Sequence, residues 1–243
     1  MSRLFSRRQR LRALYIKEAR AFFDTPAAYV VTAILLVVFG YLYGTPLFLQ
    51  GQASLEGFVD AAPLLLLFFV PAVSMRLYSE EYKSGTIELL GTLPAEDWEV
   101  LAAKYAAALT LVGFLLSLTA AYPVVLWFLG SPDWGAVAGS YAGLGLTAAV
   151  FAAIGLWASA STRNQIVAFM LAFAACFALF LAGKLHAFLP PAAARVADFA
   201  GVDAHLENLA RGVLDTRDLL YFASVIAFSL FMALRAARRA ARG

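Results

Sequence analysis

Residues 26–54 read PAAYVVTAILLVVFGYLYGTPLFLQGQAS and contain no charged side chain. A transmembrane helix needs about 20 consecutive apolar residues, whereas the apolar part of a cleavable signal peptide has only about 7–15. We therefore interpret this run as an uncleaved first membrane span over about 28–49. Similar runs recur along the chain, which is 62% apolar and 14% charged, while soluble domains average about 45–50% and about 25%. The composition excludes an ordinary soluble domain.

Charge-free length predicts six membrane spans. Their approximate ranges are 28–49, 58–75, 106–129, a part of 134–162, 165–183 and 219–234. These runs are too long for core strands and lack the strict alternation of a β-barrel, so helices are favoured. The last span is short and relies on Arg235 reaching back to the membrane interface. We expect a single all-α integral membrane domain, residues 1–243, with an amphipathic interfacial helix at 1–26.

The distribution of Lys and Arg predicts the orientation. An even number of spans places both termini on one side, and fifteen of the 19 Lys and Arg residues then share that side. Because short cytoplasmic segments are enriched in Lys and Arg, we expect both termini in the cytoplasm and a multi-pass protein of a bacterial inner membrane. The same rule explains the net charge of +3 without a nucleic-acid partner.

The segment before the first span is amphipathic. Leu11, Leu14, Tyr15 and Phe22 fall at helical spacings among Arg and Lys residues. Such a helix lies in the headgroup layer and is attracted to anionic membrane lipid, and Pro26 marks the bend into the membrane. The alternative is a basic tail that only sets the orientation, for which the charges alone suffice.

The most informative segment is the cytoplasmic loop 79–99 between the second and third spans. Residues 79–94 of this loop read SEEYKSGTIELLGTLP. Ser84 is suited to cap a short helix that begins at Gly85, and Gly91 is suited to end it. A second helix is then expected to open near residue 94 and to run into the third span.

Two features of this loop suggest docking rather than a plain solvated hairpin. Glu96, Asp97 and Glu99 fall in the first turn of the second helix, where the helix dipole favours negative charge. In the short helix, Ile87 and Leu90 are three residues apart and form an apolar ridge. A short helix with exposed apolar residues, joined rigidly to two spans, is suited to a groove in another protein.

The run Glu81–Pro94, followed by Trp98 and Lys104, resembles the signature loop of ABC-2-type permeases, especially the gliding-motility-type subgroup. The turn at 162–165 and the run at 205–215 support the resemblance, which extends over nearly the whole chain.

The resemblance implies six spans, an interfacial N-terminal helix and a coupling helix after the second span. It also implies a second permease, identical or related, and two cytosolic ABC ATPase subunits that bind ATP and Mg²⁺. No cofactor or metal is expected in this chain. The residues expected to contact the ATPase are Glu81, Lys83, Gly85, Thr86, Ile87, Glu88, Leu89, Leu90, Leu93 and Pro94.

The chain is not expected to be an enzyme. It contains no G-x-x-x-x-G-K-[ST] phosphate loop, so the hydrolysis of ATP is assigned to a separate subunit. An intramembrane protease is disfavoured because no histidine follows Glu80-Glu81 within a span, and no G-x-S-x-G motif exists. A permease-like scaffold or mechanotransmitter that moves no cargo stays open as the alternative function.

The external segment 184–218 is expected to contain short helices or a re-entrant element. Asp203, His205 and Glu207 alternate there and could offer ligands to a metal, although local capping or pairing is favoured. The resemblance instead favours a structural or gate role here, and His205, Glu207 and Arg211 are the candidate residues of an external gate.

Glycines recur in the fourth span at positions 139, 143, 145 and 155. Such spacing permits two helices to approach closely. Packing within the chain is the default interpretation, and dimerisation through this face is the alternative.

Overall fold

The computed structural model describes residues 7–49, 55–87, 95–130, 132–185 and 189–240, and their regular structure is helical throughout. The helices, in chain order, are α1 (Arg7–Phe23), α2 (Pro26–Leu49), α3 (Glu56–Ser74), α4 (Arg76–Ser84), α6 (Asp97–Thr119), α7 (Ala121–Leu129), α8 (Trp134–Ser161), α9 (Gln165–Leu185), α10 (Pro191–Ala200), α11 (Val202–Ala210) and α12 (Thr216–Ala240).

Within the described residues, six helical stretches are long and apolar enough to cross a membrane, which confirms the predicted all-α fold and its six spans. Helices α3 and α4 together make the second stretch, and α6 and α7 together make the third. The last span was predicted to be short, but α12 has 25 residues. Its charge-free part is still 219–234, so the reach of Arg235 back to the membrane interface stays a prediction.

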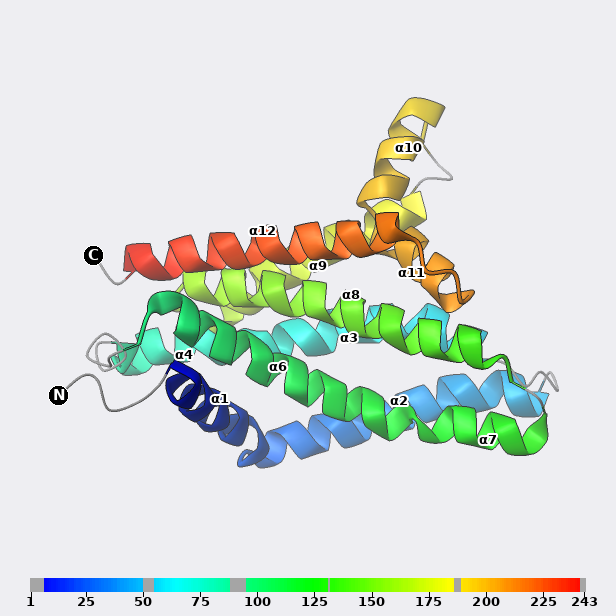
Figure 1. Ribbon diagram of the computed structural model, residues 1–243, viewed down its shortest axis with the longest axis horizontal. Helices are drawn as coiled ribbons and strands as arrows, with labels where there is room; N and C mark the ends of the chain where they lie inside the picture. The colour runs from blue at the N-terminus through cyan, green and yellow to red at the C-terminus, as the bar shows by residue number, and fades with distance from the viewer. Residues whose placement is uncertain (1–6, 50–54, 88–94, 131, 186–188, 241–243) are drawn as a thin grey trace.

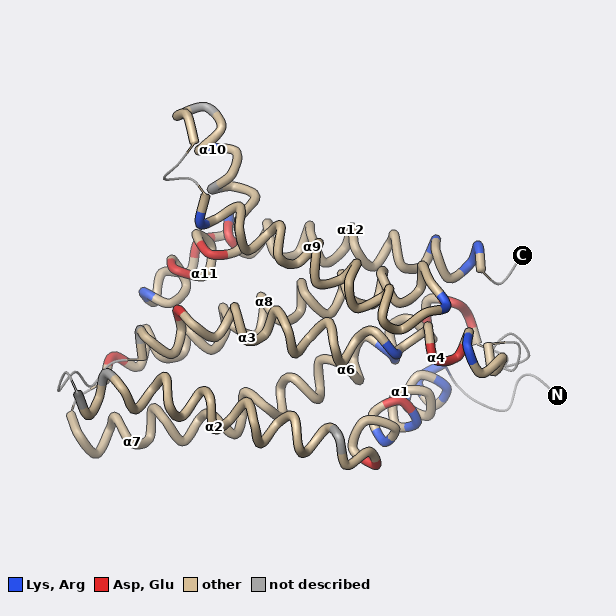
Figure 2. The backbone as a smooth tube through the Cα atoms, turned by 180° about the vertical axis from the view of Figure 1, so that it is seen from behind, with Lys and Arg blue, Asp and Glu red and all other residues tan. Residues whose placement is uncertain are grey.

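The long helices run side by side along one axis, and both ends of the described chain lie at the same end of the bundle (Figure 1). Charged residues gather near the two ends, and the middle is almost free of them (Figure 2). Helices α10 and α11, which occupy the predicted external segment, lie at the end away from the termini, where α10 projects from the bundle. This distribution suits a bilayer whose apolar core is about 30 Å thick.

Helix α8 is the central helix and packs against α3, α6, α9, α11 and α12. Its small residues make this possible. A Cβ atom added at Gly139 would overlap the backbone carbonyl of Leu209 in α11, and one added at Gly155 would overlap Ser74 of α3. These glycines therefore serve packing within the chain, as the default interpretation held, whereas Gly145 has nothing within 4 Å of its Cβ position.

A side-chain hydroxyl joins α8 to the point where α3 passes into α4. Ser159 Oγ accepts hydrogen bonds from the amides of Tyr78 (2.9 Å) and Ser79 (3.1 Å), and it donates to the carbonyl of Met75 (2.8 Å). Tyr82 donates to the carbonyl of Ala160 at 3.3 Å. These bonds satisfy backbone groups that would otherwise be buried without partners.

A side chain of α8 also bonds the backbone at the junction between α6 and α7. Pro123 has no amide hydrogen, so the carbonyl of Thr119, four residues earlier, loses its helical donor. Tyr141 of α8 replaces it by donating to that carbonyl at 2.7 Å. At both of these junctions in the described chain, a side chain of α8 bonds the backbone where the span is interrupted.

We predict that Gly139→Ala destabilises the fold, because the new methyl group would overlap the carbonyl of Leu209 and force α8 and α11 apart. Overpacking of this kind costs about 1–3 kcal/mol. Thermal unfolding of the purified chain in detergent should show a melting temperature several degrees lower. Gly145→Ala in the same helix is the matched control and should leave it unchanged. Equal melting temperatures for both variants would contradict the proposed close contact.

Candidate functional site

The N-terminal helix α1 is held against α6 at the end of the bundle that carries the termini. Leu14 is buried with Val100 and Ala103 of α6. The hydroxyl groups of Tyr15 and Thr110 share a hydrogen bond of 2.8 Å. The predicted apolar side of α1 therefore packs largely on the protein. The expected place of α1 in the headgroup layer stays a prediction.

Lys104 of α6 is fully buried where α1, α4 and α6 meet. Its Nζ donates to Glu81 Oε1 of α4 at 2.8 Å and to Glu18 Oε2 of α1 at 3.2 Å. The ring of Tyr78 lies 5.1 Å from the ammonium group and adds a cation–π contact. One cation thus links three helices, and we call Lys104, Glu18 and Glu81 the lysine cluster.

A second buried charge secures the start of α6. Glu99 is fully buried, accepts a hydrogen bond from Arg10 of α1 at 3.3 Å and lies 3.8 Å from Nε of Arg7. It also accepts from the amide of Glu96 at 3.1 Å, and together these two glutamates form a capping box. This confirms the predicted helix start. The guanidinium of Arg7 stacks over the ring of Trp98 at 4.3 Å.

Helix α4 ends differently from the prediction. Ser84 is its last residue and donates from Oγ to the carbonyl of Glu80 at 2.9 Å, so it does not cap a following helix. Gly85 ends α4 with φ of 73°. A glycine at this position of a helix adopts the left-handed conformation without the penalty that a Cβ brings. Gly85 therefore terminates the preceding helix instead of beginning the next.

The predicted ATPase-contact residues fall into two groups. Of those that the structure describes, Glu81 belongs to the lysine cluster, and Lys83, Gly85 and Thr86 are exposed. Ile87 is half-buried and packs on the main apolar core. The ridge of Ile87 and Leu90 stays a prediction, because the remaining residues lie outside the described part of the chain: Glu88, Leu89, Leu90, Leu93 and Pro94.

A cavity of about 550 Å³ opens between α1 and α4 beside the lysine cluster. Charged side chains of both signs line it, among them Lys17, Arg76 and Glu80. Glu81 Oε2 is buried and has no hydrogen-bond partner among the described residues. The junction is therefore polar and open at the end of the bundle from which the predicted docking loop leaves.

At the opposite end, His205 holds α11 to α12. Its Nδ1 lies 2.6 Å from Asp218 Oδ1, and its Nε2 donates to the carbonyl of Phe199 at 3.1 Å, since a carbonyl only accepts. The imidazole stacks on Tyr221 with ring centroids 4.0 Å apart. Asn208 donates to the second oxygen of Asp218 at 3.1 Å. His205 is thus buried and paired with Asp218, a partner thirteen positions away that no local pattern predicted.

The three side chains considered as metal ligands have different partners. Asp203 pairs with Lys184 at 2.7 Å, Glu207 pairs with Arg211, and His205 turns toward Asp218. No group of three metal-ligating side chains occurs among the residues that the structure describes. Local pairing, the favoured interpretation, is what the structure shows.

A bundle of six membrane-length helices with a charged junction at one end is the architecture of a polytopic helical membrane protein. A profile of the family described as "ABC-2 family transporter protein" matches residues 12–226. The chain belongs to the ABC-2 family of transporter membrane proteins, which confirms the resemblance seen in the signature loop. The gliding-motility-type subgroup stays a prediction. A search of the curated proteins finds no match to the chain.

Membership makes the chain a permease-type membrane subunit and implies an ABC ATPase partner and often a dimer. Two of the residues that carried the resemblance make contacts that hold α1 to the bundle. Lys104 is the centre of the lysine cluster, and Trp98 contacts Arg7 of α1. Glu18 was not predicted, although it is the only acidic residue of a helix that is otherwise basic, and this contrast was the available signal.

We predict that Lys104→Met separates α1 from the bundle, because it leaves two carboxylates at a buried junction without their cation. Removing one member of a buried ion pair costs about 3–5 kcal/mol. The melting temperature of the purified chain should fall by about 10 °C, since about 2–4 °C corresponds to 1 kcal/mol at this chain length. Cleavage by protease within α1 should become faster.

Lys83→Met, at an exposed position of α4, is the matched control and should change neither quantity. Combining Lys104→Met with Glu18→Gln and Glu81→Gln removes the unpaired charges, so most of the lost stability should return. If Lys104→Met is as stable as Lys83→Met, the lysine cluster does not hold α1.

Proposed function

We propose that this chain is the permease subunit of an ATP-driven transporter in a bacterial inner membrane, and that it couples ATP hydrolysis by a cytosolic partner to the movement of a substrate. Membership of the ABC-2 family supports the permease assignment. The observation that carries the coupling is the lysine cluster, which joins α1, α4 and α6 at one buried ammonium group.

The position of this cluster explains how a force could enter the bundle. Helix α4 leads into the predicted docking loop, and α6 begins where that loop ends. Because Lys104 bonds Glu81 of α4 and Glu18 of α1, a displacement of the loop moves three helices together. Helix α4 is in turn bonded to the central helix α8 through Ser159. The loop is thus linked to the core by short hydrogen bonds.

The partner subunits are expected to supply the ATP-binding sites and the second half of the membrane part. We assign ATP and Mg²⁺ to the cytosolic ATPases and propose that a second copy of this chain, or a related permease, completes the membrane part. A ligand-driven change between two states requires that the ATPases contact those states differently. Helix α11, with His205, Glu207 and Arg211, is proposed as the external gate.

The coupling assignment predicts the effect of Leu90→Asp. A carboxylate on the apolar ridge would either be desolvated in the ATPase groove at a cost of several kcal/mol or push the surfaces apart. Co-purification with the ATPase, or the stimulation of its hydrolysis in reconstituted vesicles, should fall at least tenfold.

The purified chain alone should hydrolyse no ATP.

Arg239→Asp, in the basic tail at the end of α12, is the control for this experiment and should leave assembly and hydrolysis unchanged. Wild-type assembly and hydrolysis by Leu90→Asp would show that the ridge is not the docking element. Cargo transport in the same vesicles distinguishes a permease from a scaffold that moves no cargo.

The orientation predicts which engineered thiols are accessible from outside. Cys176 is the only cysteine and is buried, so Cys176→Ala provides a background for single thiols. In sealed cells, a membrane-impermeant maleimide should label Glu207→Cys and should not label Lys83→Cys until the cells are opened. Both positions are exposed. The reverse pattern would invert the assigned topology.

A further inference from the structure

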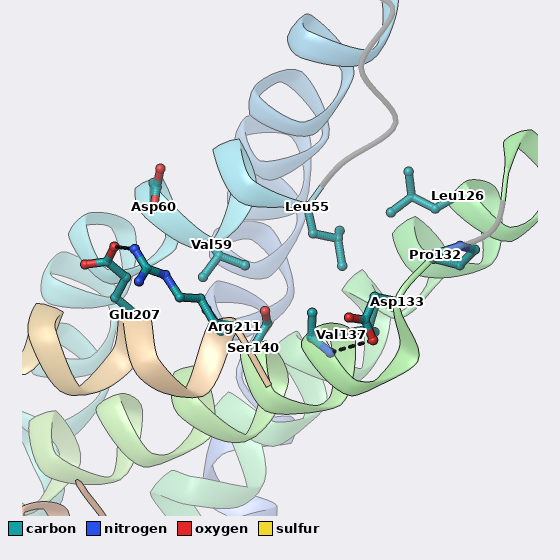
Figure 3. Close-up of a pocket in the computed structure, with 12 residues that line it drawn as sticks. Leu55, Val59, Asp60, Leu126, Pro132, Asp133, Val137, Ser140, Glu207 and Arg211 are labelled. Carbon is teal, nitrogen blue, oxygen red and sulfur yellow. Dashed lines mark hydrogen bonds and ion pairs between the residues drawn. The ribbon is translucent and has the colours of Figure 1, made fainter. Parts of the chain in front are cut away.

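A cavity of about 550 Å³ lies between α3, α8 and α11 at the end of the bundle away from the termini. Figure 3 shows Asp60 and the Glu207–Arg211 pair on one side of it, and Pro132 and Asp133 on the other. The volume falls in the range of small-molecule sites, about 300–1,000 Å³. The cavity is separate from the lysine cluster, which lies at the opposite end.

The wall of this cavity is apolar over much of its length. Leu55 and Val59 contribute from the start of α3, Leu126 from α7 and Val137 from α8. Such a wall favours a ligand with a hydrocarbon or aromatic body, since each buried methylene contributes about 0.8 kcal/mol.

The charges around the cavity leave one carboxylate without a partner. Glu207 is paired with Arg211, and Asp133 Oδ1 accepts the amides of Gly135 (2.8 Å) and Ala136 (3.3 Å) at the start of α8. Asp60 makes no hydrogen bond or ion pair with the described residues, and its side chain is exposed to the cavity.

A smaller cavity of about 80 Å³ continues from the first and shares Asp60 and Glu207 with it. Lys184 and Asp203 line this extension, and they are paired with each other at 2.7 Å. Each Lys or Arg around the combined space therefore already has a carboxylate partner, so the net charge is negative. An anionic ligand would meet repulsion, whereas a cation would find Asp60 available.

Ser140 provides an independent indication of a ligand. It lines the cavity and is only 4% exposed, and its hydroxyl oxygen, which is accessible from the cavity, makes no hydrogen bond with the described part of the chain. In Figure 3 the hydroxyl points from α8 toward the space between α8 and α3. A ligand in the cavity would supply the missing partner.

We propose that this cavity binds a monocationic amphiphile. Its ammonium group would pair with Asp60, a polar group next to its body would bond Ser140, and the body itself would lie on Leu55, Val59 and Val137. Asp60, which has neither a cation nor an amide as partner among the described residues, selects a positive charge, and the absence of an unpaired Lys or Arg among the described lining residues rejects anions. The site faces the side opposite the docking loop and needs no ATPase to bind.

The test uses the full chain in nanodiscs of phosphatidylcholine and dansylcadaverine, a fluorescent monocation with an aromatic body. Fluorescence enhancement should saturate beyond the signal of empty nanodiscs and should weaken at high salt. Asp60→Asn removes the charge at an exposed position and should raise the dissociation constant about tenfold, as for a charge-assisted hydrogen bond. Dansylglycine, an anion with the same aromatic group, should not bind.

Asp24→Asn, which removes an exposed carboxylate at the other end of the bundle, should bind dansylcadaverine like the wild type. Val137→Trp fills the cavity from its apolar wall and should abolish binding while the melting temperature is retained. The proposal is overturned if Asp60→Asn or a folded Val137→Trp binds like the wild type, if dansylglycine binds equally well, or if no saturable signal exceeds that of empty nanodiscs.

Discussion

Close contact between α8 and its neighbours is the constraint on which the rest of the structure depends. Inside a bilayer, helices gain little from the hydrophobic effect, so they associate through van der Waals contact and hydrogen bonds. Gly139 and Gly155 bring α8 against the backbone of α11 and α3. This contact places α11 over the start of α8 and thereby encloses the cavity that contains Ser140. A larger side chain at Gly139 would remove the contact and the cavity together.

Buried polar groups then fix the two short helices that the apolar contacts alone would leave loosely attached. At the end with the termini, Lys104 and Glu99 hold α1. At the other end, His205 and Asp218 hold α11 to α12. In each case the polar group lies near the end of a long helix, where water and headgroups lower the cost of charge. Among the described residues, the middle of the bundle is almost free of charged side chains (Figure 2).

The fold was largely predictable because membrane spans are encoded by local composition: a charge-free run of sufficient length has few alternatives to a helix. Pairing between distant residues was not predictable. Glu18 and Lys104 are 86 positions apart, and their meeting depends on the angle at which α1 crosses α6. The start of α6 near its acidic residues was local and was predicted, although the capping box between Glu96 and Glu99 was not, and Ser84 was assigned to the wrong helix. A serine near a helix end can bond backward or forward, and Gly85 decides between them through its left-handed conformation.

The hydroxyl of Ser159 has a consequence for movement. It bonds three backbone groups of the segment from Met75 to Ser79, so these bonds oppose rotation of α4 relative to α3 at their junction. A torque applied to α4 is therefore transmitted to the long helices α3 and α8. The hydroxyl of Ser159, together with that of Tyr82, thus ties α4 to the central helix α8. Ser159→Ala would remove the Ser159 bonds and let α4 rotate more freely relative to α3, while the exposed residues stayed unchanged.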